Sequence, residues 1–302
     1  MQSMAQTGSP TSYTCGWCGA SGPGNALSCP SCGAAVDIRL RVTEAGWTEL
    51  PAIADMTRIQ FGHSTCQIEG AYVPVADMTL ADGDGVYFNH HVLLWLQPGV
   101  TVRGMSLRGA WKRMRAGLPL IMTEALGPGR IAFSADAPGE IVALPLQPGQ
   151  SVDVREHVLL VATSQVAYDW FAPDIWFTTG SGDDRETHYP LGQNMDRFNA
   201  PNAPGLLLLH GAGNVFVRRL APGEQVLIKP TALLYKDSGV HMQLHVERVD
   251  NPSSGFLAVN QRHVWARLTG PGRVAMQSAF EHVHDEGRRL TSYPKTTTWR
   301  DW

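Results

Sequence analysis

Pro-Gly dipeptides divide most of this chain into short apolar segments. Between residues 98 and 272 the dipeptide occurs seven times, beginning at Pro98, Pro128, Pro138, Pro148, Pro204, Pro222 and Pro271. Proline presets φ for the first central position of a type II turn, and glycine readily adopts the positive φ of the second. Turns of this kind between strand-like runs predict an all-β fold, either a sandwich or a barrel.

The apolar segments also repeat. "LQPGQSVDVREHVLLVATSQVAY" (residues 146–168) aligns without a gap with "LAPGEQVLIKPTALLYKDSGVHM" (220–242), so that the Pro-Gly turns, Val152 with Val226, and the Leu-Leu pairs coincide. A weaker third copy spans residues 82–100, and "GPGR" occurs in both "LGPGRIAFS" and "LTGPGRVAMQ". Recurrence on this scale predicts stacked or wrapped β units that share one core.

Two Cys-x-x-Cys pairs lie near the beginning of the sequence. Together they supply four thiolates, the soft tetrahedral shell that zinc prefers in a structural site. A segment this short cannot bury a core, so metal binding would supply most of its folding energy. The sequence therefore predicts a small zinc ribbon with structural zinc, whose ligands are Cys15, Cys18, Cys29 and Cys32.

Other chemistries of the cysteine pairs are disfavoured. A reducing compartment argues against disulfides, and the absence of a surrounding βαβ pattern argues against a redox-active Cys-x-x-Cys. Four cysteine ligands leave no open position, so the metal is predicted not to be catalytic. Because no Lys or Arg precedes Arg39, nucleic acid is not the expected partner of the ribbon. We expect the ribbon to dock on protein instead, with Tyr13 and Trp17 as candidate contacts.

Composition limits the remaining function classes. Hydrophobic residues make up 43% of the chain and charged residues 17%, which suits a packed core. A net charge of −3 disfavours a general binder of nucleic acid or membrane surfaces. The apolar run "GLLLLHG" is too short to span a bilayer, and the sequence shows neither a secretory n-region nor an Arg-rich transit segment. We therefore expect a cytoplasmic protein without a membrane span.

Three long segments resemble a known family. "RMRAGLPLIMTEALGPGRIAFSADAPGEIVALPL", "LAPGEQVLIKPTALLY" and "LTGPGRVAMQS" are similar to the altered-inheritance-of-mitochondria family of mitochondrial biogenesis proteins, number twenty-four of that series, over roughly Ser64 to Phe280. The resemblance implies an all-β, pseudo-repeated domain whose fold is grouped with that of the tryptophan RNA-binding attenuator protein (TRAP). It implies no set of catalytic residues.

Histidines are the other candidate metal ligands. "VHMQLHVE" places His241, His245 and Glu247 on one strand face. His241 and His245 would lie about 13 Å apart, too far to share a metal, so this face is expected to be a polar exterior. His282 and His284 form a His-x-His pair in "EHVHDEG", but the spacing departs from the cupin pattern and a solvated terminus is expected.

The remaining candidates have simpler interpretations. His91 and His157 occupy matching repeat positions and are expected to form local hydrogen bonds at strand ends. Cys66 alternates with apolar residues and is interpreted as a small buried hydrophobe. The tail ends in "TTTWRDW", and its tryptophans predict that it folds back on the body or docks on a partner.

These features predict a division of the chain and a function. The expected parts are a disordered N-terminus (1–12), the zinc ribbon (13–36), a connector (37–63), the TRAP-like β domain (64–284) and a C-terminal tail (285–302). The predicted function is a non-enzymatic scaffold or adaptor, in which the β body serves assembly or protein binding and the ribbon is a docking module. Unpaired strand edges would allow a homo-oligomer, most simply one with closed symmetry. The alternatives are a metal-dependent cupin-like enzyme with histidine ligands and a small-molecule sensor.

Overall fold

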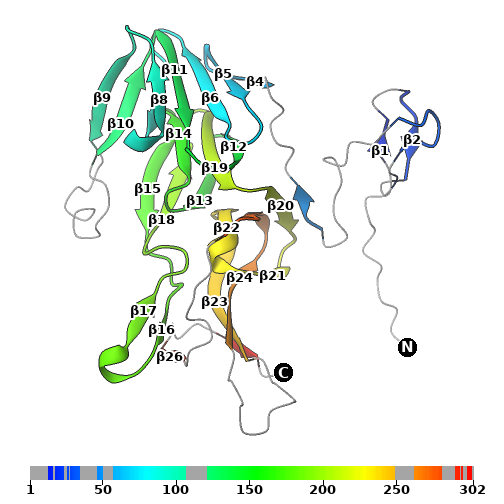
Figure 1. Cartoon of the computed structure of the whole chain (residues 1–302), viewed down its shortest axis with the longest axis vertical. Coiled ribbons are helices and arrows are strands. Elements are labelled where there is room, and N and C mark those ends of the chain that lie inside the picture. The colour runs from blue at the N-terminus through cyan, green and yellow to red at the C-terminus, as the bar shows by residue number, and fades with distance from the viewer. Residues whose placement is uncertain are drawn as a thin grey trace.

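The structure is a computed structural model, and it describes residues 13–15, 18–23, 26, 28–34, 46–49, 57–106, 121–248, 262–280, 290–292, 294 and 298–300. These residues form β-strands and three single-turn 3₁₀ helices, η2 (His90–Val92), η3 (Gly182–Asp184) and η4 (Pro230–Ala232). The all-β prediction is therefore confirmed (Figure 1). No helix among these residues is long and apolar enough to cross a membrane.

Three repeats of six strands make up the body, in agreement with the sequence repeats. Repeat 1 contains β6 (Val75–Leu80), β7 (Gly85–Phe88), β8 (Leu93–Leu96), β9 (Thr101–Ser106), β10 (Ile121–Leu126) and β11 (Gly129–Ser134). Repeat 2 contains β12 (Gly139–Leu146), β13 (Ser151–Arg155), β14 (Leu159–Thr163), β15 (Ala167–Phe171), β18 (Met195–Asn199) and β19 (Gly205–Ala212). Repeat 3 contains β20 (Val215–Leu220), β21 (Gln225–Ile228), β22 (Leu233–Asp237), β23 (His241–Arg248), β24 (Arg262–Thr269) and β25 (Gly272–Gln277).

The three repeats share one pairing pattern. Within each repeat the sixth strand pairs with the first and third strands, and the fifth strand pairs with the second and fourth. All of these ladders are antiparallel. Each repeat therefore consists of two half-sheets of three strands, and neither half-sheet is closed on itself.

Half-sheets of neighbouring repeats join into larger sheets. The third strand of repeat 2, β14, pairs with the second strand of repeat 1, β7. In the same way β22 of repeat 3 pairs with β13 of repeat 2. Four further strands join these sheets: β3 (Thr48–Glu49), β4 (Thr57–Phe61), β5 (Ser64–Glu69) and β27 (Thr298–Arg300). We name the sheets that result I (β4-β5-β6-β11-β8), II (β12-β19-β14-β7-β10-β9), III (β15-β18-β13-β22-β25-β20-β3) and IV (β21-β24-β23-β27).

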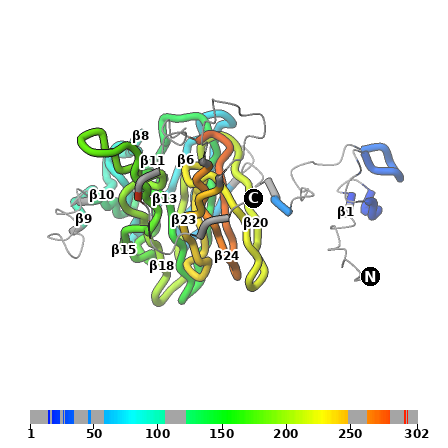
Figure 2. The backbone as a smooth tube through the Cα atoms, turned by 90° about the horizontal axis from the view of Figure 1, so that it is seen from below, coloured from blue at the N-terminus to red at the C-terminus, as the bar shows by residue number. Residues whose placement is uncertain are grey.

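Three apolar clusters separate successive sheets, one between I and II, one between II and III, and one between III and IV. Sheets II and III thus pack on both faces, which predicts continuous apolar runs in place of alternation. The run Leu206–Leu209 in β19 illustrates this, because Leu206 and Leu208 face sheet I whereas Leu207 and Leu209 face sheet III. Viewed from below, β23 and β24 of sheet IV lie in front of the middle of the body (Figure 2).

A β-bulge explains the recurring Leu-Leu pair. The second leucine of each pair, which is Leu94, Leu160 or Leu234, is skipped in the ladder with the sixth strand of its repeat. An extra residue in one strand shifts the side chains that follow to the other face. Leu159 accordingly faces sheet III, while Leu160 and Val161 both face sheet I.

The Pro-Gly turns follow the prediction at some sites only. At Pro148 and Pro222 the following glycine has a φ of 83° or 77°, and a backbone hydrogen bond closes the turn. At Pro138 and Pro204 the prediction is wrong, because Gly139 and Gly205 begin strands and do not have a positive φ. A Cβ at Gly139 would lie 2.1 Å from the carbonyl oxygen of Gly211, so this glycine is required by the close approach of β19.

Further strands extend the repeats at their edges. In the expected connector, β3 (Thr48–Glu49) pairs with β20, and β4 (Thr57–Phe61) pairs with β5 (Ser64–Glu69), which continues to β6. A small sheet contains β16 (Phe177–Thr179), β17 (Glu186–His188) and β26 (Leu290–Ser292). In the tail, β27 (Thr298–Arg300) pairs in parallel with β23, so this part of the tail does fold back on the body.

One buried ionic group lies where repeats 2 and 3 meet. Asp153 in β13 stands directly opposite Arg197 on β18 and Lys236 on β22. Its carboxylate, which is fully buried, accepts hydrogen bonds of 2.6 Å from Arg197 Nε and 2.6 Å from Lys236 Nζ. Burial alone would raise the pKa of this carboxyl group, but the two cations outweigh it and hold the pKa below its ordinary value of 3.8.

Removal of the Lys236 charge should destabilise the protein strongly. We expect Lys236→Met to lower the free energy of unfolding at pH 7 by about 3–5 kcal/mol, because a buried carboxylate would lose one of its two cations. The double variant Asp153→Leu/Lys236→Met should lose less, because it leaves no unpaired buried carboxylate. Urea denaturation followed by circular dichroism measures both.

The loss of stability in Lys236→Met should become smaller as the pH falls. Because the folded pKa of Asp153 is lowered, its stabilising contribution is present above the ordinary carboxyl pKa and is lost as the pH falls through the folded value. The difference between the wild type and Lys236→Met should therefore shrink below about pH 4. An unchanged difference there would show that Asp153 is not the group involved.

Candidate functional site

Two equivalent turns position the cysteines of the ribbon. In each turn the glycine after the second cysteine donates its N–H to the carbonyl of the first cysteine, Gly19 to Cys15 at 2.9 Å and Gly33 to Cys29 at 2.8 Å. Gly19 and Gly33 have φ values of 70° and 74°, which explains why glycine occupies both positions. A short hairpin of β1 (Tyr13–Thr14) and β2 (Ser21–Gly22) supports the first turn.

The turns bring four sulfur atoms together. Cys15 Sγ lies 3.7 Å from Cys32 Sγ, Cys18 Sγ lies 3.7 Å from Cys29 Sγ, and all four atoms lie within 4.8 Å of one another. A tetrahedral ion with metal–sulfur bonds of about 2.3 Å requires sulfurs about 3.8 Å apart, whereas a disulfide bond is about 2.05 Å long. The four cysteines therefore have the geometry to bind a metal ion, as the sequence analysis expected.

Cys66 provides no second reactive sulfur. Its side chain in β5 is fully buried, and burial, assisted by the negative charge of Asp77, raises the thiol pKa to about 12. The thiolate form is therefore negligible near neutral pH. The interpretation of Cys66 as a small buried hydrophobe is confirmed.

The histidines of the body do not gather at one point. His241 is exposed at the start of β23, as expected for a polar exterior. The expectation is wrong for His245, which is fully buried and has its Nδ1 atom 2.6 Å from Arg267 Nη2. His245 lies in the interior of sheet IV, opposite Trp265 of β24 and Thr298 of β27, so strands flank it on both sides.

No second metal cluster appears in the described part of the chain. There, the four ribbon cysteines are the only group of three or more His, Cys, Asp or Glu side chains close enough to hold an ion. His282 and His284 lie outside the described residues. His91 lies in η2 of repeat 1, and His157 follows β13 of repeat 2.

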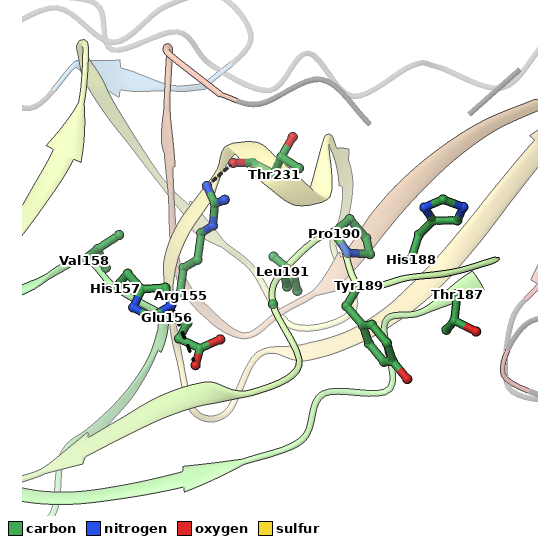
Figure 3. A pocket seen from close by; sticks show the side chains of 11 residues that line it. Arg155, Glu156, His157, Val158, Thr187, His188, Tyr189, Pro190, Leu191 and Thr231 are labelled. Carbon is green, nitrogen blue, oxygen red and sulfur yellow. Dashed lines mark hydrogen bonds and ion pairs between the residues drawn. The ribbon is translucent and has the colours of Figure 1, made fainter. Parts of the chain in front are cut away.

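A cavity of about 590 Å³ opens beside His157 (Figure 3). It is lined by Arg155, Glu156, His157, Val158, Thr187, His188, Tyr189, Pro190, Leu191, Gly192 and Thr231. Arg155 donates a hydrogen bond of 2.6 Å to the carbonyl of Thr231, and His188 Nε2 lies 2.7 Å from Thr179 Oγ1. No signal in the sequence pointed to Arg155 and His188, because they lie at the ends of two strands, β13 and β17, that are far apart in the chain.

The cavity has groups in its lining that can bind a polar ligand. Its imidazole, hydroxyl and guanidinium groups can hydrogen-bond a polar ligand, and its volume falls in the usual range for small-molecule sites. The lining contains no Cys, Ser or Lys, so Thr and Tyr hydroxyls are its only uncharged oxygen nucleophiles.

The cysteine cluster should hold one divalent metal ion per chain. We expect purified wild-type protein to retain about one equivalent and Cys15→Ser/Cys29→Ser to retain almost none, because two of four ligands are removed. Mass-spectrometric metal analysis checks this. Cys66→Ala serves as the control and should keep the full equivalent, since Cys66 lies in the body.

Comparison with known proteins agrees with this architecture. The crystal structure of a Streptococcus pyogenes protein is similar, with a TM-score of 0.53 and 18% sequence identity, over 72% of this chain and 94% of that one. At this identity the likeness concerns the fold alone. A search of the curated proteins found no match. The sequence profile of the family described as "Mitochondrial biogenesis AIM24" matches residues 66–279, which include all three repeats. The chain therefore belongs to the AIM24 family of mitochondrial biogenesis proteins.

Proposed function

We propose that this protein is a non-enzymatic scaffold or adaptor, in which the β body supports assembly or protein binding and the ribbon is a second docking module. The observation that carries the proposal is the cluster of four sulfur atoms, because it leaves no open position for a substrate or a reactive water. Membership of the AIM24 family, for which no catalytic residues are implied, supports it.

We further propose that the ion is zinc and that its role is structural. Four thiolates suit zinc better than magnesium, calcium or manganese, which favour oxygen ligands. The described ribbon residues offer only two short strands and few apolar side chains, so the ion would supply most of the folding energy of the module. Cys15, Cys18, Cys29 and Cys32 are the ligands in this proposal.

The partner of the ribbon is proposed to be a protein. The described ribbon residues include no Lys or Arg, whereas binding to phosphates depends on these side chains. Four thiolates around a divalent zinc ion also leave a net negative charge, which would repel nucleic acid. A cytoplasmic location stays a prediction.

A small-molecule sensor is a second candidate function. The cavity beside His157 favours it, because it combines a suitable volume with several hydrogen-bonding groups. The cupin-like enzyme has less support, since the described histidines of the body do not converge with carboxylates on one point.

The docking role of the ribbon can be tested by comparing partners captured from the native host. We expect full-length wild-type protein to recover at least one partner that Cys15→Ser/Cys29→Ser recovers at least tenfold less, because loss of the ion unfolds the ribbon. Quantitative mass spectrometry of the captured proteins measures this.

The control variant is Cys66→Ala, which should capture the same partners as the wild type. Circular dichroism of all three proteins checks that the β body is intact. An identical set of partners with and without the ribbon cysteines would contradict the docking role.

A further inference from the structure

The two junctions between repeats have the same register. At the first junction Tyr87 of β7 lies opposite Ala162 of β14. At the second junction Asp153 of β13 lies opposite Lys236 of β22. In the repeat alignment Tyr87 corresponds to Asp153, and Ala162 corresponds to Lys236. A single rule therefore joins the second strand of one repeat to the third strand of the next.

Under the same rule two strands, β8 and β21, keep an edge without a partner among the described residues. Among the described residues, β8 of repeat 1 pairs only with β11, and β21 of repeat 3 pairs only with β24. These are the third strand of the first repeat and the second strand of the last, the two partners that the rule would join. Its register would place Leu96 opposite Leu227 and Gln97 opposite Val226.

Exposed apolar side chains lie on β8, the free edge of sheet I. Leu94 is 55% exposed, and Trp95 and Leu96 are each 38% exposed. The counterparts of Leu94 and Trp95 in repeats 2 and 3 are buried against the preceding sheet, Leu160 and Val161 against sheet I, and Leu234 and Tyr235 against sheet II. Leu94 and Trp95 thus lie where a preceding sheet would cover them, and an exposed apolar strand edge of this kind favours association.

The two edges do not meet within one chain. In Figure 1, β8 lies in the upper part of the body and β21 in its lower part. Three apolar clusters and sheets II and III intervene between sheet I, which contains β8, and sheet IV, which contains β21. A partner for β8 must therefore come from outside the chain.

We propose that β8 of one chain pairs with β21 of a second copy, so that sheet I of one chain and sheet IV of the next form one continuous antiparallel sheet. This inference rests on the proposed scaffold function and names the partner of its β body. The central side chains of the joint, Leu96 and Leu227, are both apolar, which suits a buried position between two chains. Because the contact is head-to-tail, each pair keeps one free β8 and one free β21 and can add further copies.

Mass in solution tests the pairing with full-length protein. We expect light scattering to give wild-type masses above the 32.9 kDa of one chain, rising with protein concentration. Leu96→Lys and Leu227→Lys should each be monomeric, because each blocks one edge with an unpaired charge. A one-to-one mixture should give a discrete dimer, since one variant keeps an intact β21 and the other an intact β8.

Two further variants serve as controls. Leu96→Lys/Leu227→Asp copies the internal Lys236–Asp153 pair and should associate again, which would show that the single variants are folded. Tyr72→Lys changes another exposed residue, 86% exposed in the turn between β5 and β6, and should leave the mass of the wild type unchanged.

Cysteine cross-linking locates the contact. Under mild oxidation Leu96→Cys/Leu227→Cys should form covalent multimers, and neither single cysteine variant should. Three outcomes would overturn the proposal: a wild type that is monomeric at all concentrations, a cross-link within one chain, or lysine variants that both associate as strongly as the wild type. Capture of a partner by the ribbon could still succeed in that case, so the two proposals fail separately.

Discussion

The antiparallel ladder between the second strand of one repeat and the third strand of the next turns three small β units into one body. A half-sheet of three strands alone has an unpaired edge and an uncovered apolar face. The neighbouring repeat supplies a strand that pairs with the edge and a sheet that covers the face. β7 with β14, and β13 with β22, form these ladders here. The apolar clusters on either side of sheets II and III exist because the ladders align two half-sheets in one plane.

The side chains at the ladders differ although the backbone register is constant. Tyr87 meets Ala162 at one junction, and Asp153 meets Lys236 at the other. A buried ion pair contributes less to stability than its Coulomb energy suggests, because both charges lose their hydration. Its strict requirement for a partner does, however, disfavour a strand that slips by one residue. The polar pair in sheet III therefore helps to specify which strand pairs with which.

The ribbon and the body obtain their order from different sources. In the ribbon, two hydrogen-bonded turns gather four sulfurs around one point, and a bound ion would replace the core that so few residues cannot form. In the body, order comes from buried apolar side chains and backbone ladders, and two side chains with ionisable groups are packed inside it. Cys66 and His245 are both fully buried, and neither lies in the cavity beside His157.

The sequence by itself determined the class of fold, the repeats and the cluster of four cysteines, because each depends on local chemistry: turn-forming dipeptides, apolar periodicity and short-range cysteine spacing. Only the tertiary structure decided that β19 faces two cores, that His245 is buried and that Asp153, Arg197 and Lys236 lie in one row. These facts depend on which strands become neighbours across tens of residues, and alternation along a single strand cannot distinguish a solvent-facing side from one that another sheet covers.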